Sequence, residues 1–131
     1  MKVLILDGDW HFAQQASAHL ESFAHLVVHH SSLEPALAQI EHWQPDLVIL
    51  GAEFAEKALA APVFDRRPRP AVLLTEHMDR YDRAWRAWQK GGDELLMKPI
   101  FTHEELHAAI VTALENATAG TRRRRVHAAS A

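Results

Sequence analysis

The side chains best suited to chemistry follow the apolar runs of this chain. Asp7 and Asp9 come just after one run, Thr75 ends another, and Lys98 follows a third. If these runs are parallel strands, their carboxyl ends meet at one edge of a sheet, where α/β proteins bind ligands. Two carboxylates beside an ammonium group form at best a weak cation site. The most continuous apolar run ends on Gly51, which has no side chain that can react.

Five short apolar runs predict the strands of a sheet. They lack the alternation of a strand that is exposed on one face, which indicates a parallel sheet covered on both faces. The predicted strands are residues 3–6, 26–28, 47–50, 71–75 and 95–97. Apolar residues at helical spacing lie between the runs, and the connections are long enough for crossovers. The chain is therefore predicted to be an α/β protein, a doubly wound five-stranded parallel sheet with helices on both faces.

Capping residues mark the starts of several predicted helices. Asp9 suits the start of the first helix, and either Ser31 or Ser32 suits the start of the second. Thr102 begins the last helix, and Glu105 three residues later completes a capping box. Residues 52–69, which are rich in proline and arginine, predict an irregular surface segment with at most a short helix.

The composition predicts one soluble domain. The chain has 131 residues, of which 48% are hydrophobic and 24% charged, and it has no cysteine, which excludes disulfides and thiolate metal sites. No run approaches the roughly 20 apolar residues of a membrane span, and a cytoplasmic location is expected. We assign residues 1–118 to the domain and residues 119–131 to a basic, disordered tail or linker.

Charge is unevenly distributed along the chain. Arg122 to Arg125 hold four of the 14 basic residues, which leaves 10 basic against 17 acidic residues in 1–121. An acidic body argues against nucleic-acid binding, although the arginine run alone is compatible with it. His103 and His107 lie four residues apart, but no third ligand is evident nearby, so no metal site and no cofactor are predicted.

Several segments give the chain its resemblance to a known family. They are residues 3–9, Pro-Asp-Leu-Val-Ile-Leu at 45–50, residues 72–75, and Gly-Gly-Asp-Glu-Leu-Leu-Met-Lys-Pro at 91–99. The Lys-Pro pair behind a Gly-x-Asp turn, followed by a Glu-Glu-Leu helix, is the most specific feature. Over residues 1–117 the chain resembles the receiver domain of bacterial response regulators. The resemblance implies a flavodoxin-like sheet with strand order 2-1-3-4-5.

The resemblance also implies a function in two-component signal transduction. In that family an aspartate after the third strand takes a phosphoryl group from a histidine kinase, and two adjacent acids after the first strand hold Mg²⁺. A threonine or serine after the fourth strand and a lysine after the fifth contact the phosphoryl oxygens and the acceptor. Mg²⁺ and cationic groups are needed because the phosphoryl group brings negative charge to a carboxylate.

This sequence keeps the outer parts of that pattern and lacks its centre. Four positions match the family: Asp7, Thr75, Lys98 and Pro99. Gly8 stands where the second acid is usual, with Asp9 after it, and Gly51 stands where the phosphoacceptor belongs. Leu95 replaces the aromatic residue that usually follows the phosphate signal. We therefore expect a degenerate, non-enzymatic receiver domain in which Lys98 pairs with Asp7 in a static pocket.

The expected function is phosphorylation-independent binding of a protein partner, an output domain or a second copy of the chain. The predicted surface combines the helix at 79–90 with the fifth strand and the last helix, and includes Trp85, Trp88 and Leu95. In the helix at 79–90, the predicted inward face is Tyr81, Ala84, Ala87 and Trp88, with Trp85 at its edge.

Two other functions remain open from the sequence. Glu53 or Asp9 would serve as a non-standard phosphoacceptor. Alternatively, a small ligand would bind in the vacant space that Gly8 and Gly51 leave near Thr75 and Lys98.

Overall fold

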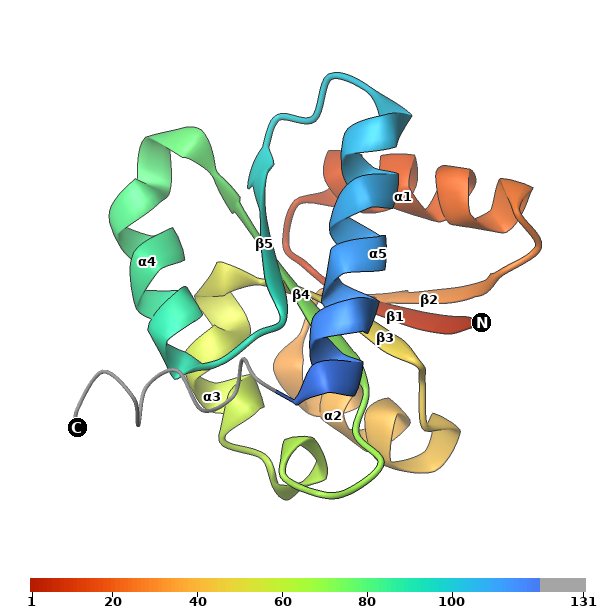
Figure 1. The fold of residues 1–131 in the computed structure, drawn as a ribbon, viewed down its shortest axis with the longest axis vertical. Coiled ribbons are helices and arrows are strands. Elements are labelled where there is room, and N and C mark those ends of the chain that lie inside the picture. Colours follow the sequence, from red (N-terminus) through yellow and green to blue (C-terminus); the bar gives the residue numbers. More distant parts are fainter. Residues whose placement is uncertain (121–131) are drawn as a thin grey trace.

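The computed structural model describes residues 1–120, which form one parallel sheet between two layers of helices (Figure 1). The sheet order is β2-β1-β3-β4-β5, and every neighbouring pair is parallel, which confirms the predicted fold class and strand order. The strands are β1 Lys2–Leu6, β2 Leu26–His30, β3 Leu47–Gly51, β4 Ala71–His77 and β5 Glu94–Lys98. The helices are α1 Trp10–Ser22, α2 Leu33–Trp43, α3 Ala55–Leu59, α4 Tyr81–Lys90 and α5 His103–Ala119. Short 3₁₀ helices span Ala52–Phe54, Pro62–Phe64 and Met78–Arg80.

The alternation of side chains along each strand divides the core into two clusters. One face of the sheet packs against α1 and α5, and the other face packs against α2, α3 and α4. β3 is buried along its whole length, because both of its faces are covered by helices. The carboxyl ends of the strands are therefore held at fixed positions relative to one another.

Capping side chains begin two of the helices as expected. The Asp9 carboxylate accepts a hydrogen bond of 3.0 Å from the backbone N–H three residues later, at the start of α1. Thr102 Oγ1 accepts from the backbone N–H of Glu105 at 3.4 Å, and the Glu105 carboxylate accepts from the N–H of Phe101 at 2.9 Å. Ser32 is the N-cap residue of α2, but its side chain makes no capping hydrogen bond.

The region around α4 differs from the sequence prediction. β4 continues two residues beyond Thr75, so a 3₁₀ turn precedes α4 and the helix begins at Tyr81. Ala84 and Ala87 face the core as predicted, but the inward position predicted for Tyr81 is wrong, because this side chain is 67% exposed. At the other end of the chain, α5 runs to Ala119, the first residue of the predicted tail 119–131, and residues 121–131 of that tail lie outside the described residues.

The segment before β4 contains a buried ion pair, although the sequence predicts an irregular surface segment there. The Arg69 guanidinium donates two hydrogen bonds of 2.8 Å to the Asp93 carboxylate, and the two side chains are 4% and 0% exposed. The backbone N–H of Val72 donates to the same carboxylate at 2.7 Å. This pair holds the amino-terminal ends of β4 and β5 together.

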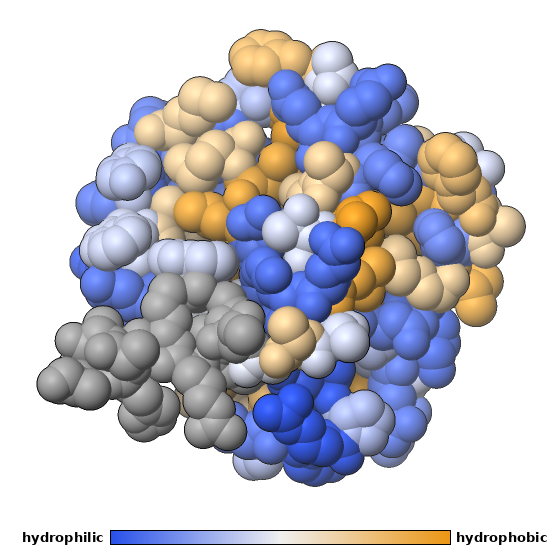
Figure 2. All heavy atoms as spheres, viewed as in Figure 1, coloured by the Kyte–Doolittle hydropathy of each residue, from blue (hydrophilic) through white to orange (hydrophobic). Residues whose placement is uncertain are grey.

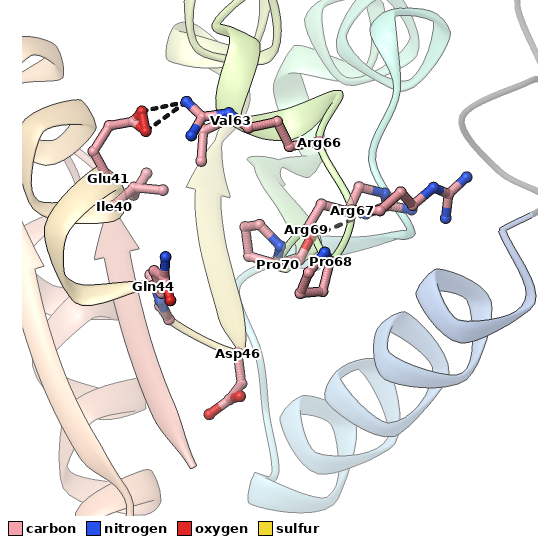
Figure 3. Close-up of a pocket in the computed structure, with 11 residues that line it drawn as sticks. Ile40, Glu41, Gln44, Asp46, Val63, Arg66, Arg67, Pro68, Arg69 and Pro70 are labelled. Atoms are coloured by element: carbon pink, nitrogen blue, oxygen red, sulfur yellow. Dashed lines mark hydrogen bonds and ion pairs between the residues drawn. The ribbon is translucent and has the colours of Figure 1, made fainter.

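A cavity of about 420 Å³ lies beside this pair, between the end of α2 and the segment that leads to β4 (Figure 3). Its wall includes the Arg66–Glu41 ion pair, with Arg67, Arg69 and Asp46 around it. It lies at the amino-terminal edge of the sheet and is therefore distinct from the pocket that the sequence predicts.

Candidate functional site

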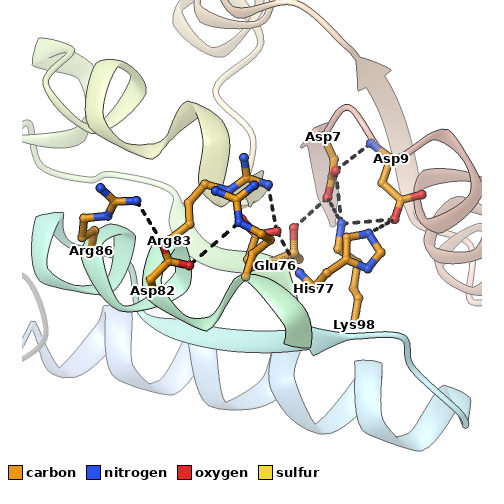
Figure 4. Close-up of polar contacts among 10 residues, drawn as sticks. Asp7, Asp9, Glu76, His77, Asp82, Arg83, Arg86 and Lys98 are labelled. Atoms are coloured by element: carbon orange, nitrogen blue, oxygen red, sulfur yellow. Dashed lines mark hydrogen bonds and ion pairs between the residues drawn. The ribbon is translucent and has the colours of Figure 1, made fainter.

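The centre of the predicted pocket is the buried carboxylate of Asp7, at the carboxyl end of β1. Thr75 Oγ1 donates a hydrogen bond of 2.7 Å to Oδ2, and Lys98 Nζ lies 3.1 Å from Oδ2 and 3.3 Å from Oδ1 (Figure 4). The backbone N–H of Asp9 donates to Oδ1 at 2.9 Å. Asp7 is 0% exposed and Lys98 is 4% exposed, so the expected ion pair is present and removed from solvent.

Asp9 extends this network toward the surface. Its Oδ2 lies 3.4 Å from Lys98 Nζ and 3.0 Å from Nε2 of His77, the last residue of β4. Burial of the Asp9 carboxyl opposes its ionisation. Hydrogen bonding from the start of α1, the Lys98 ammonium and His77 nevertheless hold its pKa below the ordinary value. Lys98 therefore lies between two carboxylates and attracts both.

Gly51 lies beside this network, paired in register with Thr75. A Cβ atom at position 51 would overlap Glu53 Oε1 and would lie 3.0 Å from Glu53 Cδ and 3.3 Å from Asp7 Cγ. A Cβ atom at Gly8 would lie 3.4 Å from Glu53 Oε2. The space that the two glycines leave is therefore not vacant, because the Glu53 carboxyl fills the part next to Gly51.

The Glu53 carboxyl is in an unfavourable environment for its charge. The residue as a whole is exposed, but its carboxyl lies against the end of the sheet. Partial desolvation and the neighbouring Asp7 carboxylate raise the pKa of Glu53, whereas its own backbone hydrogen bond, Lys98 and Arg83 act in the opposite direction. The sequence suggests Glu53 only as an alternative acceptor and does not show that it reaches this position.

The residues at this edge do not fit the Mg²⁺ that the family pattern implies. Mg²⁺ requires several oxygen ligands in near-octahedral geometry. Gly8 and Gly51 offer no side-chain oxygen, and the Lys98 ammonium already lies between the Asp7 and Asp9 carboxylates. Among residues 1–120 no group of three or more His, Cys, Asp or Glu side chains could hold a metal ion.

A second ion pair holds α4 against the end of β4. Glu76 is buried, and its carboxylate contacts Arg83 Nε, accepts from Arg83 Nη2 at 3.1 Å and accepts from the N–H of His77 at 2.8 Å (Figure 4). Burial opposes ionisation, but these hydrogen bonds and the guanidinium charge hold the pKa of Glu76 below its ordinary value of 4.5. The sequence does not reveal this pair, because β4 is predicted to end at Thr75, one residue before Glu76.

The other predicted site residues are distributed over two regions. Pro99 follows Lys98 through a cis peptide bond at the edge of the pocket. Trp85 is 51% exposed on α4, whereas Trp88 and Leu95 are half-buried against the helix and sheet cluster of α2, α3 and α4. Of these three residues, only Trp85 is more than half exposed.

Comparison with known proteins identifies the fold. No protein-family model and no curated protein sequence matches the chain. Among solved structures, it is similar to the signal receiver domain of a putative LuxO repressor protein from Vibrio parahaemolyticus, with 22% identity and a TM-score of 0.72, over 91% of this chain and 93% of that one. A response regulator receiver modulated diguanylate cyclase from Pelobacter carbinolicus is 24% identical with a TM-score of 0.68, over 92% of this chain and 97% of that one.

NtrX from Brucella abortus, solved in complex with ADP, is 21% identical with a TM-score of 0.73. The similarity covers 91% of this chain but only 27% of the NtrX chain. These likenesses show that the chain has the receiver fold.

Within the described residues, no helix has the length and apolar character needed to cross a membrane.

We predict that Lys98→Met destabilises the fold. The substitution keeps the aliphatic stem but leaves the buried Asp7 carboxylate without its cation, and breaking a buried pair costs roughly 3–5 kcal/mol. Urea unfolding monitored by circular dichroism measures the change. Lys57→Met, at an exposed position of α3, is the matched control and should change the free energy of unfolding little. Equal stability of the two variants would show that the ion pair does not hold this edge together.

We also predict that the Glu76 carboxylate contributes stability that depends on pH. Because its folded pKa is depressed, the contribution is present above about pH 4.5 and is lost as the pH falls through the lower folded value. Glu76→Gln should therefore lower the free energy of unfolding by about 1–2 kcal/mol at pH 7. The difference from the native chain should shrink in the acid range. Unfolding curves at several pH values measure this, with Glu34→Gln at an exposed position as the control.

Proposed function

We propose that this chain is a receiver-fold module of bacterial signal transduction that acts by binding a protein partner, without being phosphorylated. The observation that carries the proposal is the environment of position 51. Residue 51 itself supplies no acceptor carboxylate, and the neighbouring Asp7 carboxylate is already paired with Lys98 and hydrogen-bonded by Thr75. A phosphoryl group would have neither the usual acceptor nor a free cation to stabilise its charge.

The ion pair between Glu76 and Arg83 supports the same proposal. Switching of the receiver type requires two conformations of α4 and the end of β4, and a ligand has to shift the equilibrium between them. Here a buried carboxylate of β4 is paired with a guanidinium of α4, so a second arrangement would have to break that pair. Leu95 also takes the place of the aromatic residue expected to respond. A fixed α4 suits a module whose partner recognises one constant surface.

The surface formed by α4, β5 and α5 is the proposed contact surface. Trp85 and Tyr81 are large, exposed side chains on α4, and the exposed Asp82–Arg86 ion pair lies on the same helix (Figure 4). Exposed aromatic residues among charged ones are typical of interface hot spots. In the view of Figure 2, hydrophobic groups lie beside the hydrophilic outer surface of α5. A protein partner, an output domain or a second copy of the chain would dock on this surface.

Two competing functions concern the same site. The position of the Glu53 carboxyl next to Gly51 and Asp7 favours Glu53 over Asp9 as a non-standard phosphoacceptor. Binding of a small ligand is less favoured, because the Glu53 carboxyl fills the space next to Gly51.

We predict that the chain gains no phosphoryl group when it is incubated with acetyl phosphate and Mg²⁺. Intact-mass spectrometry measures the outcome, with a phosphorylatable receiver domain treated in parallel as the positive control. A mass gain of one phosphoryl group would refute the proposed function. Its loss in Glu53→Gln but not in Asp9→Asn would then identify Glu53 as the acceptor.

We further predict that Trp85→Ala weakens partner binding. Removal of a hot-spot tryptophan costs about 2 kcal/mol or more, which is roughly a thirtyfold loss of affinity. Light scattering measures self-association, and quantitative pull-down measures binding of a protein from the native host. Trp10→Ala is the matched control, because Trp10 is 67% exposed but lies at the start of α1, outside the proposed surface. Equal losses in both variants would place the interface elsewhere.

A further inference from the structure

The two glycines that depart from the family pattern share one neighbour. Gly8 follows β1 and Gly51 ends β3, and the two carboxyl oxygens of Glu53 lie against the positions where their Cβ atoms would be. We propose that Glu53 is the residue that closes this site, because its carboxyl occupies the space that a side chain at position 51 would need. Gly8 and Gly51 are then complementary to Glu53 rather than independent losses.

The local backbone explains how Glu53 reaches this position. The 3₁₀ helix Ala52–Phe54 begins directly after Gly51, so the chain turns at once and places residue 53 over the strand end. Lys98 of β5 and Arg83 of α4 partly offset the desolvation and the Asp7 charge that disfavour a carboxylate at this position. The residue as a whole is exposed, while its carboxyl lies against Gly51 and Gly8.

The neighbours on the other side of Gly51 cannot move away. β3 is buried throughout, and a Cβ atom at position 51 would also lie 3.3 Å from Cγ of the fully buried Asp7. An added side chain therefore has to displace the Glu53 carboxyl, which is the flexible group. A side chain at position 51 and the Glu53 carboxyl thus compete for the same space. The group that occupies this space determines whether a ligand can enter the site.

This inference deepens the proposed function and rests on it, since both take the native site to be closed to phosphate. Its separate claim is that the Glu53 carboxyl keeps the site closed, in addition to the absence of acidic residues at positions 8 and 51. The test compares two variants. The first carries Gly8→Asp and Gly51→Asp, and the second carries both substitutions together with Glu53→Ala. The control combines the pair with Glu56→Ala, which removes a nearby exposed glutamate of α3.

The probe is beryllofluoride with Mg²⁺, detected by the ¹⁹F NMR signal of the bound species. We expect the variant that lacks Glu53 to bind the probe at least about tenfold more tightly than the acid pair alone or the control with Glu56→Ala, a difference of about 1.4 kcal/mol. Equal binding by all three variants, or binding by none, would overturn the inference. Phosphorylation of the native chain would instead refute the proposed function, so the two failures are distinguishable.

A second measurement applies if the acid-containing variants do not fold, as judged by circular dichroism. Gly51→Ala adds only the Cβ atom, and its effect on the melting temperature is measured in the native chain and in Glu53→Ala. We expect the substitution to be less favourable for the melting temperature in the native chain than in Glu53→Ala, because the Glu53 carboxyl has to be displaced only in the native chain. The same decrease in both backgrounds would show that Glu53 and a side chain at position 51 do not compete.

Discussion

The buried carboxylate of Asp7 is the constraint around which the carboxyl edge of the sheet is arranged. A charge without solvent contact is tolerated only when it is paired and hydrogen-bonded. Lys98 supplies the opposite charge, and Thr75 and the backbone of Asp9 supply hydrogen bonds. These partners come from β5, from β4 and from the turn after β1. One carboxylate therefore connects elements that are distant in sequence and fixes how their ends approach one another.

Two other buried carboxylates in the described residues, those of Asp93 and Glu76, are also paired with a cation. Arg69 and Asp93 hold the amino-terminal ends of β4 and β5, and Glu76 and Arg83 hold α4 to β4. A ligand moves a conformational equilibrium only if it binds one state better than another. When the buried charges are already paired in one arrangement, a second arrangement must break pairs before it gains new contacts. This cost is the physical basis of the proposal that the chain presents one constant surface.

The fold was predictable from the sequence because its signals are local. Strands buried on both faces appear as continuous apolar runs, and parallel strands bring Asp7, Thr75 and Lys98 to one edge whatever lies between them. Features that depend on side-chain direction or exact element ends were not predictable. The burial of Arg69 depends on the path of an irregular segment. The outward position of Tyr81 and the pairing of Glu76 depend on where β4 ends.

Glu53 shows why a site can differ from its fold. A comparison of residue types at fixed positions reports Gly51 as the loss of a carboxylate. The structure shows a carboxylate in the same region, but it comes from two residues further along and returns through a 3₁₀ turn. A carboxyl group is thus present near the strand end, but its attachment point, its orientation and the open space around it differ from those that the family resemblance implies. Because function depends on those three properties rather than on the fold, the receiver architecture by itself does not imply the receiver reaction.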